Sequence, residues 1–87
     1  MNMKTVNENM SLDRMRPGSR SIIQSIEGDK KFVRRAAGRG FTPEAALLVI
    51  QNFGIGPLIV FLCDTQVALG RGEAKKIIVR RQQHECE

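Results

Sequence analysis

Short runs of apolar residues alternate with turn residues along the 87-residue chain, a pattern typical of proteins built from short strands. Residues 20–26 and 76–81 are rich in isoleucine and valine. Residues 57–64 form an apolar run that is too short for a typical helix. A tight reversal at 64–65 leads from this run into residues 66–69. We therefore predict a strand in each of these four ranges.

Residues 29–40 change to helical spacing, with apolar residues on one side and cations on the other. Asp29 suits the N-cap because its carboxylate can accept a backbone N–H of the first turn. Gly40 suits the left-handed position just after the last turn. We predict one short amphipathic helix. Its apolar side consists of Phe32, Val33, Ala36 and Ala37, and its cationic side of Lys30, Lys31, Arg34, Arg35 and Arg39.

Residues 42–51 give conflicting signals. Thr42 and Pro43 suit the cap and first position of a helix that would continue through the following alanines and leucines. Val49 and Ile50 are β-branched, which favours a strand. Periodicity does not decide the matter, because the apolar run is short and continuous. Local chemistry alone slightly favours a helix.

Three turns contain glycine. Pro17 and Gly18 suit the second and third positions of a type II turn. Residues 38–40 and 70–72 both read Gly-Arg-Gly, but neither matches a phosphate-binding loop between a strand and a long helix. We interpret them as turns, the second followed by a single helical turn at 73–75.

Length and composition indicate one small domain. Residues 10–81 are expected to form it, and the segments 1–9 and 82–87, which have no apolar periodicity, are expected to be disordered tails. No segment resembles a signal peptide or reaches the ~20 apolar residues of a membrane span. Cys63 and Cys86 are too few for a disulfide-rich secreted domain, so we expect free thiols. A soluble cytoplasmic protein is predicted.

The formal net charge of +5 is distributed unevenly. Every lysine and arginine lies at or before Arg39, or at or after Arg71. Between residues 40 and 70 the only charged residues are Glu44 and Asp64. The middle of the chain is therefore expected to supply the core, and the flanking segments a cationic surface. A net positive charge of this kind favours binding to nucleic acid, to an anionic lipid surface or to an acidic protein partner.

Candidate catalytic and metal-binding residues are few. His84 is the only histidine, and its place in the C-terminal tail offers no positioned base for nucleophilic catalysis. Residues 84–87 supply imidazole, carboxylate and thiolate donors, but Cys63 is the only other soft donor, and metal sites usually bring in a second ligand pair. We expect no catalytic residue, no metal site and no cofactor.

The order and spacing of these motifs resemble the FeoA family, small cytoplasmic proteins of bacterial ferrous iron uptake. The resemblance extends from Met10 to about Arg80, and rests on the Pro-Gly turn at 17–18, the Arg-Arg-x-x-Gly-x-Gly stretch at 34–40 and the block at 67–77. It implies a mainly β fold, an SH3-like barrel of about five strands with one short helix after the first. It also implies a strand at 45–51, and we follow it because tertiary context overrides local propensity.

Two positions depart from the family pattern. The family usually has Pro-Gly where this chain has Pro43 and Glu44, which affects the geometry of that turn. It usually has a larger apolar residue or a methionine in the helix where this chain has Ala36 or Arg39. The second departure implies a thinner contact between helix and barrel, or a specialised paralogue.

The resemblance implies a non-enzymatic regulatory or assembly subunit that acts at the cytoplasmic face of FeoB, a membrane iron transporter with a G-protein domain. Contact with the membrane would be indirect, and the link to a transition metal comes from the family without requiring this chain to hold iron. The best candidate for docking is the cationic helix side, which would complement an acidic patch on the partner. An exposed sheet edge would also allow a weak homo-oligomer.

A basic small barrel that binds nucleic acid is the alternative, since the five cations between residues 30 and 39 attract phosphates. Single-strand binders, however, stack bases on exposed aromatic side chains. This chain has four phenylalanines and neither Trp nor Tyr, and we expect Phe32, Phe53 and Phe61 to lie at least partly in the core. No nucleic acid partner is therefore predicted.

Overall fold

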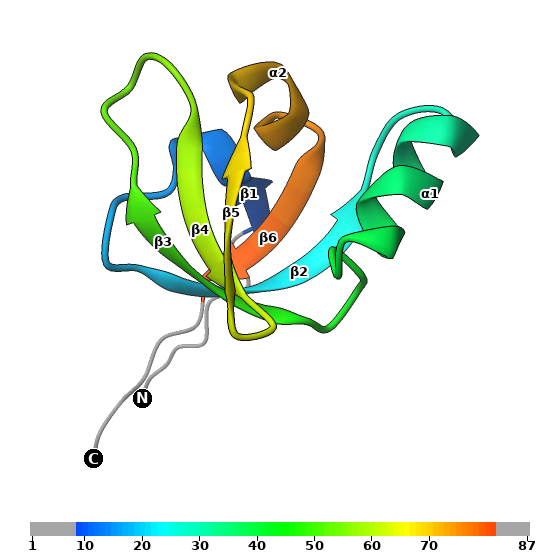
Figure 1. The fold of residues 1–87 in the computed structure, drawn as a ribbon, viewed down its shortest axis with the longest axis horizontal. Coiled ribbons are helices and arrows are strands. Elements are labelled where there is room, and N and C mark those ends of the chain that lie inside the picture. The colour runs from blue at the N-terminus through cyan, green and yellow to red at the C-terminus, as the bar shows by residue number, and fades with distance from the viewer. Residues whose placement is uncertain (1–8, 82–87) are drawn as a thin grey trace.

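The computed structural model describes residues 9–81, which form one coiled antiparallel sheet with a helix at its side (Figure 1). The sheet order is β1-β6-β2-β3-β4-β5, and all neighbouring strands are antiparallel. A 3₁₀ turn, helix α1 and the single-turn helix α2 lie between strands. In chain order the elements are β1 (Asn9–Ser11), the 3₁₀ turn (Leu12–Arg14), β2 (Arg20–Ile26), α1 (Lys30–Gly38), β3 (Ala46–Gln51), β4 (Leu58–Leu62), β5 (Thr65–Leu69), α2 (Arg71–Ala74) and β6 (Ile77–Arg81).

The core is filled by every second residue of the strands, because successive side chains of a strand point to opposite faces. In β4, Leu58, Val60 and Leu62 are buried, while Ile59 is half-buried and Phe61 is exposed on the outer face. β2, β3 and β6 alternate in the same way, whereas β5 buries only Leu69 and β1 buries no residue. The buried hydrophobic residues form a single cluster: Leu12, Met15, Ile23, Ala36, Phe41, Leu47, Val49, Leu58, Val60, Leu62, Leu69, Ala74, Ile77 and Val79.

The strands predicted from the apolar runs are confirmed as β2, β4, β5 and β6. The sheet has one strand more than expected, because β1 pairs with β6 and places Asn9 opposite Arg80. Asn9 therefore belongs to the sheet and not to a tail, and α1 follows the second strand. The rest of the two expected tails, 1–8 and 82–87, lies outside the described residues.

Residues 46–51 form β3, as the resemblance to FeoA implies, and the local preference for a helix is wrong. Both faces of this strand are apolar. Leu47 and Val49 are buried in the core, whereas Leu48 is half-buried and Ile50 is exposed on the outer face. The alternation of apolar and polar residues that is typical of a strand is therefore absent from this segment. Its continuous apolar run is equally compatible with a helix.

Helix α1 begins and ends with the predicted caps. The Asp29 carboxylate accepts the backbone N–H of Phe32 at 2.9 Å. At the other end Gly40 has a φ of +99°, and the Phe41 N–H donates to the Ala36 carbonyl at 2.9 Å, which together form a Schellman motif. This motif turns Phe41, which is 1% exposed, into the core beside Ala36. The cap is thus also the attachment point of the helix.

Helix α1 otherwise extends away from the sheet beside β2 (Figure 1). Ala36 is its only buried residue, Phe32 and Val33 are half-buried, and Ala37 is exposed. The predicted apolar side of the helix therefore makes only a thin contact with the barrel. This agrees with the small residue at position 36.

The turn at 17–18 forms as predicted, whereas the β4–β5 reversal lies at 63–64 and not at 64–65, and the single helical turn α2 spans Arg71–Ala74 and not 73–75. Gly18 has a φ of +86°, and the Ser19 N–H donates to the Arg16 carbonyl at 3.1 Å, as in a type II turn. Cys63 and Asp64 have φ values of +52° and +61° between β4 and β5. Two left-handed residues in a two-residue hairpin loop are the mark of a type I′ turn, whose twist matches that of the strands.

A third turn contains a residue that does not suit it. The Ala45 N–H donates to the Thr42 carbonyl at 3.1 Å, and Glu44 stands at the third turn position with a φ of +76°. A type II turn requires this sign of φ at that position and strongly favours glycine. Glu44 is therefore strained, and it occupies the position where the family usually has glycine.

We expect Glu44→Gly to stabilise the fold by ~0.5–1 kcal/mol, because relief of the left-handed strain exceeds the extra entropy that glycine gives the unfolded chain. Glu44→Ala is the matched control, since it removes the same charge but keeps the Cβ atom. Urea unfolding monitored by circular dichroism should show a higher midpoint for the glycine variant alone. An equal rise in both variants would assign the effect to the lost charge and contradict the strain argument.

Candidate functional site

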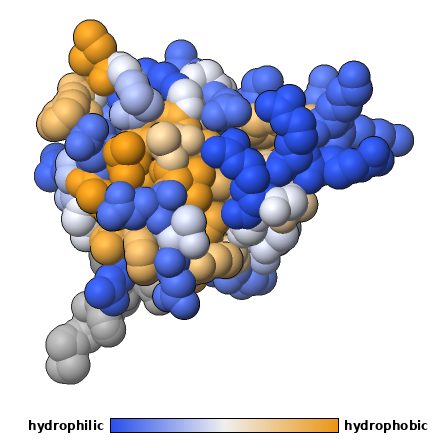
Figure 2. All heavy atoms as spheres, in the orientation of Figure 1, coloured by the Kyte–Doolittle hydropathy of each residue, from blue (hydrophilic) through white to orange (hydrophobic). Residues whose placement is uncertain are grey.

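Most cations of α1 form an open cationic surface. Lys30, Lys31, Arg34 and Arg35 are all exposed, and none of them forms an ion pair or a side-chain hydrogen bond with another residue in the range 9–81. Figure 2 shows hydrophilic side chains covering the projecting helix. These four residues are called the α1 cations below.

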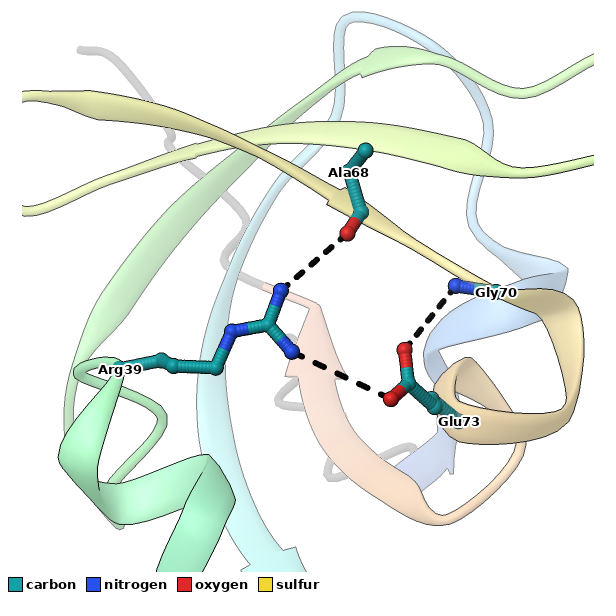
Figure 3. Close-up of polar contacts among 4 residues, drawn as sticks. All are labelled: Arg39, Ala68, Gly70 and Glu73. Atoms are coloured by element: carbon teal, nitrogen blue, oxygen red, sulfur yellow. Dashed lines mark hydrogen bonds and ion pairs between the residues drawn. The ribbon is translucent and has the colours of Figure 1, made fainter.

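Arg39, the fifth predicted docking residue, belongs to a junction between α1 and the barrel (Figure 3). Its Nη2 donates to the Ala68 carbonyl of β5 at 3.3 Å, and its Nη1 lies 3.9 Å from Oε2 of Glu73. The other oxygen of Glu73 accepts the N–H of Gly70 at 3.1 Å. Because both side chains are partly exposed, the ion pair contributes little energy. Arg39 thus links the end of α1 to β5 by one hydrogen bond, and its charge is partly offset by Glu73.

A shallow cavity of about 370 Å³ runs along α1. Val33 and Ala37 supply an apolar floor, and the cations of Lys30 and Arg34 stand beside it. Gly28 completes the lining, and no acidic residue of the range 9–81 takes part in it. This surface has the chemistry to hold an apolar side chain that is flanked by carboxylates.

The second surface is the β3–β4 loop, where the prediction that Phe53 lies in the core is wrong. Phe53 is 75% exposed, and its neighbour Ile55 is 74% exposed. Phe61 is 39% exposed, because the alternation of β4 directs it to the outer face. Phe32 is half-buried, as expected, and Phe41 is the phenylalanine that fills the core.

Arg71 fixes the β3–β4 loop to the barrel. Its guanidinium donates to the carbonyls of Gly56 and Asp13, each at 3.2 Å, and to Oδ1 of Asn52 at 2.6 Å. The Asn52 amide in turn donates to the Asp13 carbonyl at 3.0 Å, and Asn52 Oδ1 accepts the N–H of Gly54 at 3.0 Å. This network could not be predicted from the sequence, because the partners of Arg71 lie far away in the chain.

Metal-binding chemistry is sparse in the described part of the chain. Within residues 9–81 no three side chains of His, Cys, Asp or Glu come together in a way that could hold a metal ion. Cys63 is a free, exposed thiol. The tail residues His84 and Cys86, which offered soft donors, lie outside the described residues.

Comparison with known proteins decides the family. The FeoA domain model matches residues 10–81, which is nearly the whole of the described chain. The chain belongs to the FeoA domain family. The resemblance inferred from the order of the motifs is thereby confirmed. A search of curated proteins found no match.

Solved structures similar to this FeoA domain confirm the fold. A crystal structure of an iron uptake regulatory protein, FeoA, is 28% identical with a TM-score of 0.82, covering 86% of this chain and all of that one. A zinc complex of FeoA from Stenotrophomonas maltophilia, described as an SH3 domain protein, is 24% identical with a TM-score of 0.72 over 80% of this chain and 88% of that one. The predicted SH3-like barrel is thus confirmed.

The same fold also occurs in a longer protein. A manganese-dependent transcriptional repressor is 22% identical with a TM-score of 0.79, and the match covers 90% of this FeoA domain but 44% of the repressor. At this identity the likeness shows the fold alone. No helix within residues 9–81 of the FeoA domain is long and apolar enough to cross a membrane.

We expect Arg71→Lys to lower the free energy of unfolding by about 1–3 kcal/mol, because an ammonium group cannot reach all three acceptors that the guanidinium holds together. Arg14→Lys is the matched control, since the Arg14 side chain is exposed. Urea denaturation gives the free energies. A change in the control as large as that in Arg71→Lys would show that the network contributes nothing specific.

Proposed function

We propose that this FeoA domain is a non-enzymatic accessory subunit of ferrous iron uptake that docks on the cytoplasmic side of a FeoB-type transporter. The α1 cations make the contact, and any contact with the membrane is made through the transporter. The observation that carries the proposal is the projecting helix, which buries one residue and presents four cations that have no ion-pair partner among residues 9–81. Membership of the FeoA family supplies the link to iron transport.

The spacing of the α1 cations supports an acidic partner. Lys30 and Arg34 are four residues apart, as are Lys31 and Arg35, so each pair lies on one side of the helix. Like charges at this spacing destabilise a helix by about 0.2–0.5 kcal/mol per pair. A helix that served only the fold would gain from acidic residues at these positions. Carboxylates on a partner relieve the repulsion, so the free domain favours binding them.

The cavity along α1 indicates which kind of partner segment would fit this surface. Its apolar floor of Val33 and Ala37 accepts one apolar side chain, while Lys30 and Arg34 pair with carboxylates on either side of it. We assign to the transporter a segment in which an apolar residue is flanked by Asp or Glu. Binding of this kind requires no catalytic group, in agreement with the proposal of a non-enzymatic subunit.

The test is calorimetric titration of the FeoA domain into the cytoplasmic G-domain of the FeoB-type transporter from the same genome, in GDP and in a GTP analogue. Arg34→Glu/Arg35→Glu should weaken binding by about tenfold or more, since rim and surface charges steer association. Arg14→Glu/Arg81→Glu changes the net charge equally and should bind nearly as the wild type. The wild-type Kd should also rise with ionic strength.

Equal weakening by the two double variants would mean that only the net charge matters, and it would contradict docking through α1. Absence of wild-type binding in either nucleotide state would contradict the choice of the G-domain as the docking site.

Binding of single-stranded nucleic acid is the second candidate, because the outer face of the sheet exposes Phe61. A shallow cavity of about 430 Å³ holds Phe61 together with Arg20, a stacking surface beside a cation. Asp64 lines the same cavity and repels phosphate, so we prefer protein docking. Anisotropy of a labelled oligonucleotide should show no saturable binding at physiological salt. Saturation that depends steeply on salt and is lost in Phe61→Ala would instead favour this candidate.

A further inference from the structure

The tip of the β3–β4 loop is the most exposed apolar feature in the described part of the chain. Phe53 and Ile55 are 75% and 74% exposed, against 39% for the next most exposed large hydrophobic residues. In Figure 2 hydrophobic spheres stand at the outer end of this loop, which is at the upper left of Figure 1. The two side chains bury little surface in the free domain and gain by leaving water when a partner covers them.

The loop holds these side chains in a fixed position. Gly54 and Gly56 have φ values of +85° and +78°, which set the direction of the chain on either side of Ile55. Arg71 binds the carbonyl of Gly56, and Asn52 binds the N–H of Gly54. The backbone is thus fixed at both glycines. An apolar anchor that is already ordered loses little conformational entropy on binding.

We infer that Phe53 and Ile55 are a second anchor that inserts into an apolar pocket on a protein partner, and that this partner is the FeoB-type transporter bound by the α1 cations. The inference rests on the proposed function. Figure 1 shows the loop and α1 at opposite sides of the barrel, so the two contacts involve separate parts of the partner. Two joined contacts strengthen binding more than either contact alone, because the second forms within the complex.

Charge decides between a protein pocket and a lipid surface. A loop that inserts into anionic lipid needs cations beside its apolar tip. The tip itself, residues 53–57, contains no lysine or arginine, and the nearby guanidinium of Arg71 is engaged by three acceptors. The exposed Arg14 and Arg16 belong to the segment that Asn52 binds at the base of the loop, and they line a separate cavity with Asn9 and Arg81. A second copy of the domain is also a poor occupant, because two chains of net charge +5 repel each other. An uncharged apolar pocket on another protein matches the tip.

The test uses the whole FeoA domain and the full-length transporter in nanodiscs. Phe53→Ser should weaken binding by about tenfold or more, as expected for a buried aromatic anchor. Phe61→Ser is the matched control, since it makes the same change near the opposite end of β4. Thermal unfolding of both variants verifies that they fold. Because Phe53 is exposed, its substitution should leave the Tm nearly unchanged.

A fluorescent reporter gives an independent measurement. The chain contains neither Trp nor Tyr, so Phe53→Trp introduces a single emitter at the tip. Its emission should move to shorter wavelength when the transporter is added, because the indole leaves water. Phe61→Trp should show no shift.

The outcomes separate the two proposals. Wild-type binding that Phe53→Ser leaves unchanged, or a tip reporter that does not shift, overturns the second anchor and leaves docking through α1 intact. Absence of wild-type binding to the full-length transporter overturns both. A blue shift of the tip reporter on vesicles of phosphatidylethanolamine and phosphatidylglycerol without transporter also overturns the anchor, because the tip would then enter lipid. Weakening by Phe53→Ser but not by Phe61→Ser supports it.

Discussion

The interior of this barrel is filled mainly by the inward side chains of its strands, and Leu12, Met15 and Ala74 from the connecting segments complete it. A domain of this size has little apolar surface to bury, so its core leaves few residues to spare. Helix α1 adds only Ala36, and the Schellman motif behind it adds Phe41. The core is complete without the rest of the helix and without the β3–β4 loop. The exposed side chains of both elements therefore contribute little to the core, and their surfaces are available to partners.

Two arginines link the helix and the loop to the barrel. Arg39 donates to a β5 carbonyl and holds the end of α1, while Arg71 donates to carbonyls of the loop and of the 3₁₀ turn. Each uses the planar fork of the guanidinium to satisfy acceptors that the sheet leaves open. The basic composition of the chain therefore combines two kinds of cation. Some link the docking elements to the barrel, and others, on α1, form no ion pair within the described range 9–81 and can meet a partner.

Features set by neighbouring residues could be predicted from the sequence, whereas those set by distant ones could not. The Asp29 cap and the turn at Gly18 depend on local chemistry, and both were found as expected. Strand β3 was obscured because its outer face is apolar too, and only the family resemblance identified it. The role of Arg71 depends on partners 15, 19 and 58 positions away. The exposure of Phe53 follows from its place in a loop beyond the sheet, which composition alone does not reveal.

The pairing of β1 with β6 brings the two ends of the described domain together, with Asn9 opposite Arg80. A unit whose ends are neighbours can be spliced into a surface loop of another protein without forcing that loop apart. It can equally be appended to a longer chain as a self-contained module. The same fold makes up less than half of a manganese-dependent repressor. The short strand β1 thus extends the sheet beyond β6 and also brings the ends of the domain together, so that the domain can be inserted into other proteins or joined to them.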